Sequence, residues 1–281
     1  MENNLVKHIK IFTTACCILL TLAKPSQADT LFEQGRSLFY ENNLSLDKSV
    51  SCSSCHQQEY GFSDPRRVSE GINGKTLRNS MSLINNSKNI TRQFWNARSK
   101  NLKDQVLLPI QDHQEMGMTL RLVEQRTGMR ADQVASALQA FVSDIVIQAD
   151  RPQTRKERHG ARLFRNKGCA RCHTANRGDL YFVPHRLTDN GTNVGLSKVP
   201  SLVGIQYTAP YMQDGRKKTL MDVLNHYASF NQRGRGLPRN VSISRQEKSD
   251  IVAFLEGLTD SAHVMQNKWS NPNYGRSDIT T

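Results

Sequence analysis

Cys52-Ser53-Ser54-Cys55-His56 is the stretch around which this chain of 281 residues is organised, and Cys169-Ala170-Arg171-Cys172-His173 repeats its pattern. Cys-x-x-Cys-His is the sequence to which a c-type haem is attached covalently. On a helix, cysteines three residues apart project from one face, where both can form thioethers to one porphyrin. The histidine that follows lies one step further round, under the iron, as its proximal ligand. Two copies in one chain rarely arise by chance, so the sequence predicts two covalent c-type haems.

The cysteine pairs also fit a thiol redox site or half of a zinc site. A zinc site needs four Cys or His ligands at paired spacing, whereas the two motifs lie far apart in the chain. Of the six cysteines, Cys16 and Cys17 fall in an apolar N-terminal run, and the other four all belong to the two motifs. No thiol is left for a disulfide, which favours the haem interpretation.

Residues 1–28 have the pattern of a secretory signal peptide. Lys7 and Lys10 precede an apolar run at 11–23, and Ser26-Gln27-Ala28 is a small-x-small cleavage site. The run is too short for a transmembrane helix, and the polar residues after it argue against the alternative of an uncleaved anchor. No later segment could span a membrane. Because haem is attached covalently outside the cytoplasm, we expect the protein in the periplasm.

The chain is strongly basic, with a formal net charge of +13. The first 28 residues hold three lysines and one glutamate, so the remainder carries +11. Basic surfaces often bind nucleic acid, but a secreted haem protein seldom meets any, and we expect no nucleic-acid partner. An acidic protein partner or an anionic membrane surface fits better. Simple solubility is the alternative explanation of the charge.

A weak internal repeat precedes the two haem motifs. Gly35-Arg36-Ser37-Leu38-Phe39 lies before the first, and Gly160-Ala161-Arg162-Leu163-Phe164 lies before the second. In each, apolar residues at helical spacing indicate a helix that leads to a haem. Strand signals are poor throughout. The sequence therefore predicts a mainly α fold of two tandem cytochrome c-like domains, 29–150 and 151–281, with the break at Asp150-Arg151-Pro152.

Other helices are expected at 101–108, 119–127, 131–148, 220–227 and 244–258. Thr219 is the expected N-cap of the fourth of these, and Ser244 and Glu247 form a capping box for the fifth. Loops are expected at 57–93 and 174–218, a basic loop at 230–240, and a polar tail on the surface from Asp260.

Further motifs lie between and after the haem motifs and share one order. They are Phe94-Trp95-Asn96-Ala97-Arg98, Gln105, Pro109-Ile110, Glu115-Met116-Gly117, Thr208-Ala209-Pro210-Tyr211-Met212, Thr219-Leu220 and His226-Tyr227. This order resembles the bacterial di-haem cytochrome c peroxidase/MauG family from Gly35 to Thr259. Each motif alone is weak, but together they are specific.

The resemblance implies that the N-terminal haem, on Cys52, Cys55 and His56, reacts with hydrogen peroxide. Glu115 matches the family's distal acid–base, and Gln105 its distal neighbour. Bound peroxide needs a proton moved from its inner to its outer oxygen before the O–O bond breaks, and a carboxylate can carry that proton. The structural alternatives are an exposed loop acid for Glu115 and a helix-surface residue for Gln105.

Trp95 matches the tryptophan that lies between the two haems in the family. A stacked indole there can carry an electron or a hole from one iron to the other, and ordinary core packing is compatible with that role. The family usually has Phe-Trp-Asp-Gly-Arg at this point. Asn96 and Ala97 replace the Asp and Gly here, so local hydrogen bonding is expected to differ.

The C-terminal haem, on Cys169, Cys172 and His173, is by resemblance the electron-transfer site. Its far-side ligand is Met in the peroxidases and Tyr in MauG-like members, and the matching position is Tyr227. A phenolate favours oxidised iron, whereas a thioether favours ferrous iron. His226 or Met212 as the ligand, and Tyr227 as a packed aromatic residue, are the competing interpretations.

The family also holds a calcium ion between its domains, and Asn79, Thr208 and Pro210 match its ligands, the last two through backbone carbonyls.

The loop 70–75 has no His, although the peroxidases carry one there that blocks the first iron until reduction. The sequence thus predicts an enzyme that uses peroxide and either draws electrons from small redox proteins or, like MauG, oxidises a partner protein. The alternative function is a non-catalytic di-haem electron carrier.

Overall fold

A computed structural model of the chain describes residues 27–86, 92–173, 187–189, 196–229 and 242–273. Most of the predicted signal peptide and the predicted basic loop 230–240 lie outside these residues. The described part is mainly α, as predicted. Its helices are α1 (Gln27–Tyr40), α2 (Leu102–Gln111), α3 (Leu120–Thr127), α4 (Ala131–Asp144), α5 (Arg155–Asn166), α6 (Leu220–Ser229), α7 (Arg245–Glu256) and α8 (Ser261–Val264).

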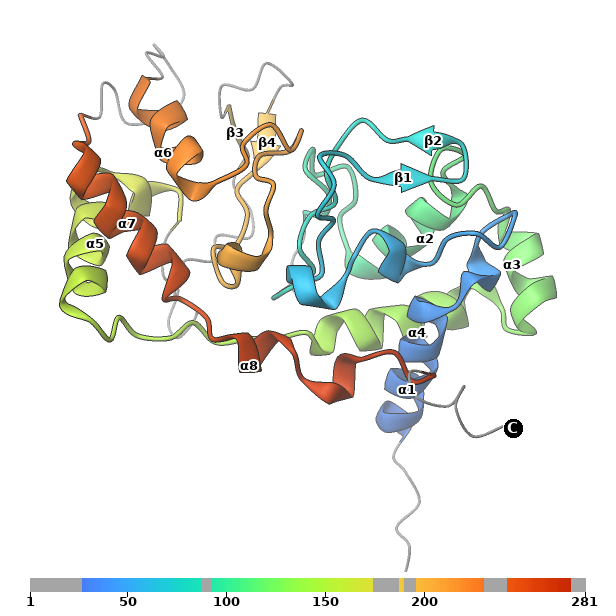
Figure 1. Cartoon of the computed structure of the whole chain (residues 1–281). Helices are drawn as coiled ribbons and strands as arrows, with labels where there is room; N and C mark the ends of the chain where they lie inside the picture. Colours follow the sequence, from blue (N-terminus) through green and yellow to red (C-terminus); the bar gives the residue numbers. More distant parts are fainter. Residues whose placement is uncertain (1–26, 87–91, 174–186, 190–195, 230–241, 274–281) are drawn as a thin grey trace, which may run out of the picture.

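Strands are short and form two antiparallel hairpins in the described residues. The first pairs β1 (Glu70–Gly71) with β2 (Gly74–Lys75). The second pairs β3 (Leu187–Asp189) with β4 (Leu196–Lys198). Figure 1 shows α1 to α4 with the first hairpin on one side of the molecule, and α5 to α7 on the other. The second hairpin lies between the two groups.

The two groups of helices are each built on one close helix crossing. α1 crosses α4 at Gly35, where an added Cβ would overlap the carbonyl oxygen of Ala137. α5 crosses α7 at Gly160, where an added Cβ would overlap the carbonyl oxygen of Asp250. Each of these glycines is the first residue of one copy of the sequence repeat. The repeat therefore has a structural basis, because each copy brings the backbones of two helices into contact.

Each crossing buries the aromatic residue that closes its copy of the repeat. Phe39 is 1% exposed and packs on Phe141 of α4 with ring centroids 5.0 Å apart. Phe164 is 3% exposed and packs on Phe254 of α7 at 5.5 Å. Two hydrophobic cores result, one around each crossing.

The predicted capping residues begin their helices as expected. Thr219 Oγ1 accepts a hydrogen bond from the Asp222 backbone N–H at 3.0 Å, before α6. Ser244 Oγ accepts one from the Glu247 N–H at 3.2 Å, and the Glu247 carboxylate accepts one from the Ser244 N–H at 2.7 Å. This capping box satisfies donors that have no partner in the first turn of α7.

The helix predicted over 131–148 ends at Asp144 instead. Asn85 provides the physical reason, because its N–H donates to the Ile145 carbonyl at 2.8 Å and its Oδ1 accepts from the Ile147 N–H at 2.9 Å. The chain beyond Asp144 is extended, so Ile145 and Ile147 point into the core and Val146 is 52% exposed. The prediction of a helix as far as residue 148 was therefore wrong at its C-terminal end.

The tail from Asp260 was predicted to lie on the surface, and this was also wrong. Val264 is 1% exposed and Trp269 is fully buried, both within the core around α1 and α4. Trp269 Nε1 donates to Asp144 Oδ2 at 2.8 Å, and the Tyr40 hydroxyl donates to the Trp269 carbonyl at 2.6 Å. Figure 1 shows this segment running from α7 back to α1.

Among the described residues, no helix has the length and apolar character needed to cross a membrane.

We expect Gly35→Ala and Gly160→Ala each to lower the free energy of unfolding by about 3 kcal/mol, because the new methyl group forces two packed helices apart. The measurement is urea unfolding of the haem-loaded protein. Gly128→Ala is the control, because that glycine has a left-handed φ of +67° but open space around it. It should cost about 1 kcal/mol. Equal losses in all three variants would contradict the helix-contact explanation.

Candidate haem sites and the junction between them

The first haem motif folds as one tight turn that starts a 3-10 helix at Cys52. The His56 N–H donates to the Cys52 carbonyl at 3.0 Å. His56 Nδ1 lies 2.9 Å from the Phe62 carbonyl, to which it can donate. A ring fixed through Nδ1 presents Nε2 to a metal. Burial lowers the pKa of His56, so its ring is neutral and able to coordinate iron.

The second haem motif repeats this turn. The His173 N–H donates to the Cys169 carbonyl at 3.1 Å. Burial lowers the pKa of His173 to about 4, and the Pro200 carbonyl only partly opposes this shift. His173 Nδ1 completes no hydrogen bond. Its ring is therefore neutral as well, which suits an iron ligand.

The first cavity, of about 630 Å³, is lined by the first motif and by the predicted distal residues together. Ligand pockets in proteins typically have volumes of about 300–1,000 Å³, so the size suits a cofactor. Predicted site residues on its wall are Cys52, Cys55, His56, Trp95, Gln105 and Glu115. Residues separated by some 60 positions in the sequence thus share one cavity, and they fit a covalently attached haem.

Glu115 is held in this cavity by the first hairpin. The Ile72 N–H donates to the Glu115 carbonyl at 2.9 Å. Gly71 packs so closely that a Cβ there would overlap the Gln114 and Glu115 backbones. Burial raises the pKa of the Glu115 carboxyl, and nearby Asp112 raises it further, whereas Arg98 lowers it. A carboxyl with a raised pKa holds its proton to a higher pH than an exposed one, which suits an acid–base residue.

His113, the one histidine of the loop 112–117, lies at the edge of the first cavity. Its side chain is 88% exposed, as in an ordinary loop residue. The hairpin 70–75 that packs on this loop contains no His.

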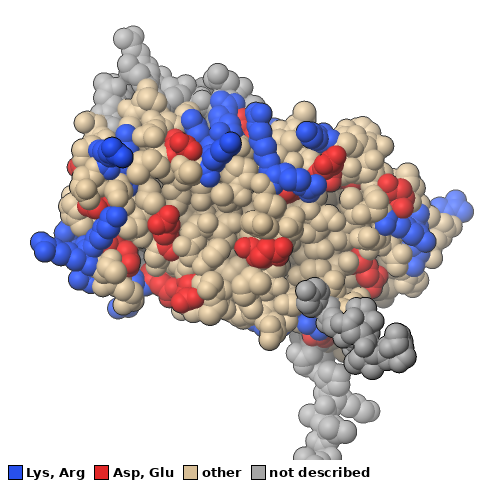
Figure 2. All heavy atoms as spheres, viewed as in Figure 1, with Lys and Arg blue, Asp and Glu red and all other residues tan. Residues whose placement is uncertain are grey.

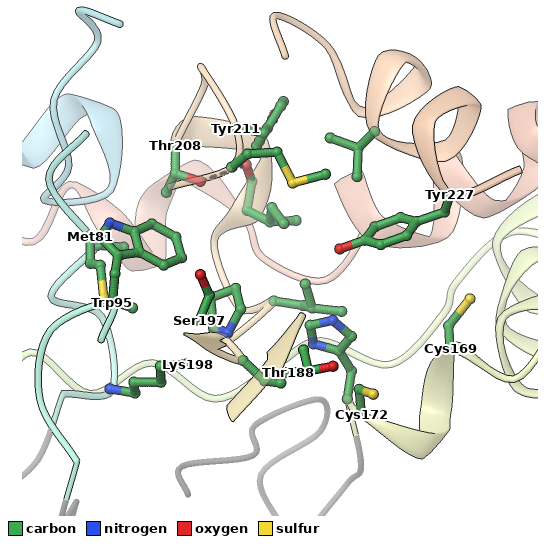
Figure 3. A pocket seen from close by; sticks show the side chains of 18 of the residues that line it. Met81, Trp95, Cys169, Cys172, Thr188, Ser197, Lys198, Thr208, Tyr211 and Tyr227 are labelled. Atoms are coloured by element: carbon green, nitrogen blue, oxygen red, sulfur yellow. Dashed lines mark hydrogen bonds between the residues drawn. The ribbon is translucent and has the colours of Figure 1, made fainter. Parts of the chain in front are cut away.

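Trp95 joins the two halves of the molecule. Its indole Nε1 donates to the Asn79 carbonyl at 2.8 Å. Its own carbonyl accepts from the Lys198 N–H of β4 at 2.7 Å. Trp95 lines both the first cavity and a second one around Cys169, Cys172 and His173. Figure 3 shows its indole facing this second cavity.

Tyr227 of α6 lines the second cavity, and Figure 3 shows its hydroxyl pointing inward. Met212 also lines this cavity, whereas His226 does not. The His226 ring instead packs edge-on against Tyr227, with centroids 5.4 Å apart. Burial raises the pKa of the Tyr227 phenol, so the phenolate form requires a nearby cation such as ferric iron.

Comparison with known proteins agrees with this arrangement. The sequence profile of di-haem cytochrome c peroxidases matches residues 29–155, and the profile of cytochrome c matches residues 158–259. The chain belongs to the di-haem cytochrome c peroxidase/MauG family. Two c-type haems and an oxidoreductase function are the shared features of that family.

Peroxidases and MauG proteins are both similar to this chain over most of its length. A cytochrome c551 peroxidase of Nitrosomonas europaea is 28% identical, over 84% of this chain and 81% of its own length. The methylamine utilization protein MauG of Methylorubrum extorquens is 28% identical, over 80% of this chain and 76% of its own. A crystal structure of a MauG-like protein associated with microbial copper homeostasis superposes with a TM-score of 0.73 at 26% identity, covering 89% of this chain and 94% of that one.

The segment 94–98 bends sharply in this di-haem protein. Ala97 has a φ of +56° and Phe94 a φ of +66°, a left-handed conformation that costs about 1 kcal/mol or more for a residue with a side chain. The Arg98 guanidinium lies 3.5 Å from the centre of the Phe94 ring, which stabilises the bend.

The three expected calcium ligands lie together at the junction. Asn79, Thr208 and Pro210 all line the second cavity. Asn79 Nδ2 donates to the carbonyls of Asp64 and Arg66, both at 2.8 Å. Because these two bonds fix the amide nitrogen, the amide oxygen faces the other way.

Sequence reasoning missed two residues of these cavities. Arg98 was part of a quoted motif without a role, yet it lines the first cavity and acts on the pKa of Glu115. Lys198 was not singled out, although it lines both cavities. A lone lysine in a loop-rich stretch carries no sequence signal of burial.

Ala97→Gly should raise the free energy of unfolding by about 0.5–1 kcal/mol, because glycine adopts the left-handed conformation without steric cost. Chemical denaturation of the haem-loaded protein measures the change. Ala131→Gly, at a helical position with φ in the ordinary range, is the control and should destabilise. A destabilised Ala97→Gly variant would contradict the strain assigned to this bend.

Proposed function

We propose that this chain is a periplasmic di-haem oxidoreductase that reacts with hydrogen peroxide at the haem on Cys52, Cys55 and His56. Electrons or oxidising equivalents pass through Trp95 to the haem on Cys169, Cys172 and His173. The observation that carries the proposal is the first cavity, in which a half-buried carboxyl of raised pKa, Glu115, shares the walls with the haem motif. The names of relatives, cytochrome c551 peroxidase and MauG, agree with it.

The bound haem supplies the iron that holds peroxide and accepts its oxidising equivalents. The residues of the chain supply the proton transfer. Glu115 takes the proton from the inner peroxide oxygen and returns it to the outer oxygen, which then leaves as water. The Arg98 guanidinium limits the rise of the Glu115 pKa and so favours the carboxylate form, which acts as the base. Gln105 lines the same cavity and can orient peroxide through its amide.

Trp95 is the proposed route between the haems, because it lines both cavities and is fixed by hydrogen bonds on each side. An indole held in one orientation by Asn79 and by the Lys198 backbone keeps the electronic path constant.

We further propose a calcium ion on Asn79, Thr208 and Pro210. Its test is metal analysis of the wild-type protein and of Asn79→Ala after dialysis against a chelator, and equal calcium contents would contradict it.

Two features favour oxidation of a partner protein, as in MauG, over simple reduction of peroxide. Tyr227 points into the second cavity and can act as a phenolate ligand that favours oxidised iron. The hairpin 70–75, next to the first cavity, has no His that could block the iron.

The partner that we propose is an acidic protein that docks near the second haem. α5 leads directly to the second motif and has an exposed basic face, formed by Arg155, Lys156, Arg158, Arg162 and Arg165. Figure 2 shows Lys and Arg at the end of the molecule where Figure 1 places α5. Electrostatic steering by such a face weakens at high salt, so a salt-independent association rate would contradict an acidic partner.

The periplasmic location is tested by sequencing the N-terminus of the purified protein. Cleavage of the signal peptide is expected after residue 28.

A di-haem electron carrier is the second candidate, since two haems alone would permit it. A carrier has two six-coordinate, low-spin haems and needs no distal acid–base. Absorption and electron paramagnetic resonance spectra of the oxidised protein distinguish the two: the proposed enzyme shows one high-spin haem that reacts with peroxide.

We expect Glu115→Gln to slow the reaction of the oxidised protein with peroxide by about 10²–10⁴-fold, because the proton transfer is lost. In the wild type the rate should fall as the pH is lowered through the pKa of Glu115, which burial raises above the ordinary value of about 4.3. The variant should lose this pH dependence. Stopped-flow absorption measures both effects.

Glu70→Gln is the matched control, because Glu70 lies in the same hairpin region but is 53% exposed. It should react at the wild-type rate. A Glu115→Gln variant that also kept the wild-type rate would exclude Glu115 as the acid–base residue.

Tyr227→Phe should abolish the low-spin signal of the second haem, because the phenol oxygen is lost as a ligand. Tyr227→Met should restore a low-spin haem with a higher reduction potential, since a thioether favours ferrous iron. Spectroelectrochemistry measures both. Tyr211→Phe changes another tyrosine of the same cavity and should leave the signal intact. An unchanged signal in Tyr227→Phe would remove Tyr227 as the ligand.

A further inference from the structure

Lys198 occupies an unusual position for a lysine. It is the last residue of β4, it lines both haem cavities, and it is only 6% exposed. Its backbone N–H donates to the Trp95 carbonyl at 2.7 Å, which ties the hairpin to the tryptophan segment. Figure 3 shows its amine end directed toward the segment that carries Trp95. A positive charge is thus placed inside the molecule, between the two haem sites.

No counter-ion for Lys198 is found in the described part of the chain. Other buried charges have one: Asp64 is paired with Arg66 at 2.8 Å, and Asp250 with His159 at 2.7 Å. Burial alone lowers the pKa of Lys198, to about 8, and no neighbouring carboxylate offsets the shift. Burying an unpaired ammonium group is unfavourable, because the charge loses its hydration. An anion at this place would stabilise the charged form of Lys198.

Two hydroxyl groups on the same hairpin lack partners as well. Thr188 of β3 pairs with Ser197 of β4 in the strand register, so their side chains share one face. Both line the second cavity and are largely buried, at 9% and 2% exposure. Neither Thr188 Oγ1 nor Ser197 Oγ has a hydrogen-bond partner within the part of the chain that the structure describes. The hairpin thus offers an ammonium group and two hydroxyls without acceptors.

Such a set of donors suits a carboxylate. The haems bring carboxylates with them, because a c-type porphyrin carries two propionate groups on the edge away from its thioether carbons. Figure 3 shows Cys169 and Cys172 at one end of the second cavity and Lys198 at the other. The cysteines that attach the porphyrin therefore lie at one end of the cavity, and the group that can bind a carboxylate lies at the other.

We propose that the β3–β4 hairpin is the anchor of the haem propionates at the junction. Lys198 pairs with propionate at the place where both cavities meet Trp95, and the hydroxyls of Ser197 and Thr188 donate to a propionate of the haem on Cys169 and Cys172. Lys198 is then a positioning residue: it fixes porphyrin edges beside the indole and raises the haem reduction potentials by offsetting propionate charge. This inference requires haem attachment only, and does not depend on the reaction with peroxide.

The test is redox titration of the haem-loaded variant Lys198→Met, followed by absorption at each haem. We expect at least one haem to be harder to reduce by about tenfold in its equilibrium constant, which is about 59 mV for one electron. Resonance Raman bands of propionate bending should shift in the same variant. Lys198→Arg should keep values close to those of the wild type. Lys75→Met is the control, since Lys75 also lines the first cavity but is exposed.

Unchanged potentials and propionate bands in Lys198→Met, or equal shifts in Lys75→Met, would overturn the proposal. If a carboxylate of the chain were the partner of Lys198, the propionate bands would stay unchanged. Should Lys198→Met fail to assemble with haem, the double variant Thr188→Val, Ser197→Ala provides the test with the lysine in place. It should shift the propionate bands and the reduction equilibrium of the second haem by about twofold, and no change in either would overturn the proposal.

Discussion

The close approach of two helix backbones, once in each half of the chain, is the constraint on which the structure depends. At Gly35 and at Gly160 there is room for a hydrogen atom and nothing larger. α1 ends at Tyr40 and the first Cys-x-x-Cys-His turn begins at Cys52, whereas α5 ends at Asn166 and the second turn begins at Cys169. The crossing therefore sets where each haem motif stands relative to its own core. Because Phe39 and Phe164 are buried by the same crossings, core packing and cofactor placement depend on the same contacts.

The junction between the halves is held by backbone hydrogen bonds around one aromatic side chain. Asn79 on one side and Lys198 on the other fix Trp95 through its indole N–H and its carbonyl. Backbone partners move less than side-chain rotamers do, so the indole keeps one orientation. This rigidity suits the charge transfer between the two haem sites that we propose for Trp95. The C-terminal segment contributes as well, since Trp269 leaves the second half and packs into the first core.

The titratable groups of the two cavities share one physical condition. Burial raises the pKa of Glu115 and of Tyr227 and lowers those of His173 and Lys198. In each case the neutral form is favoured in the protein chain. A metal ion or the carboxylates of a porphyrin then supply the charges to which these groups respond. The cavities therefore suit a charged cofactor, because some of their polar groups find no hydrogen-bond partner in the described part of the chain.

The sequence by itself determined the two haem motifs, the mainly α fold and most helix starts, because each depends on residues within one or two helical turns. Resemblance to the family added Glu115 and Tyr227, which the structure brings to the predicted cavities. Only the tertiary structure decided that α4 ends early, that Trp269 is buried and that Lys198 lies between the haem sites. The bond from Trp269 to Asp144 joins residues 125 positions apart. Such contacts leave no periodic pattern in the sequence, since they are selected by packing in space.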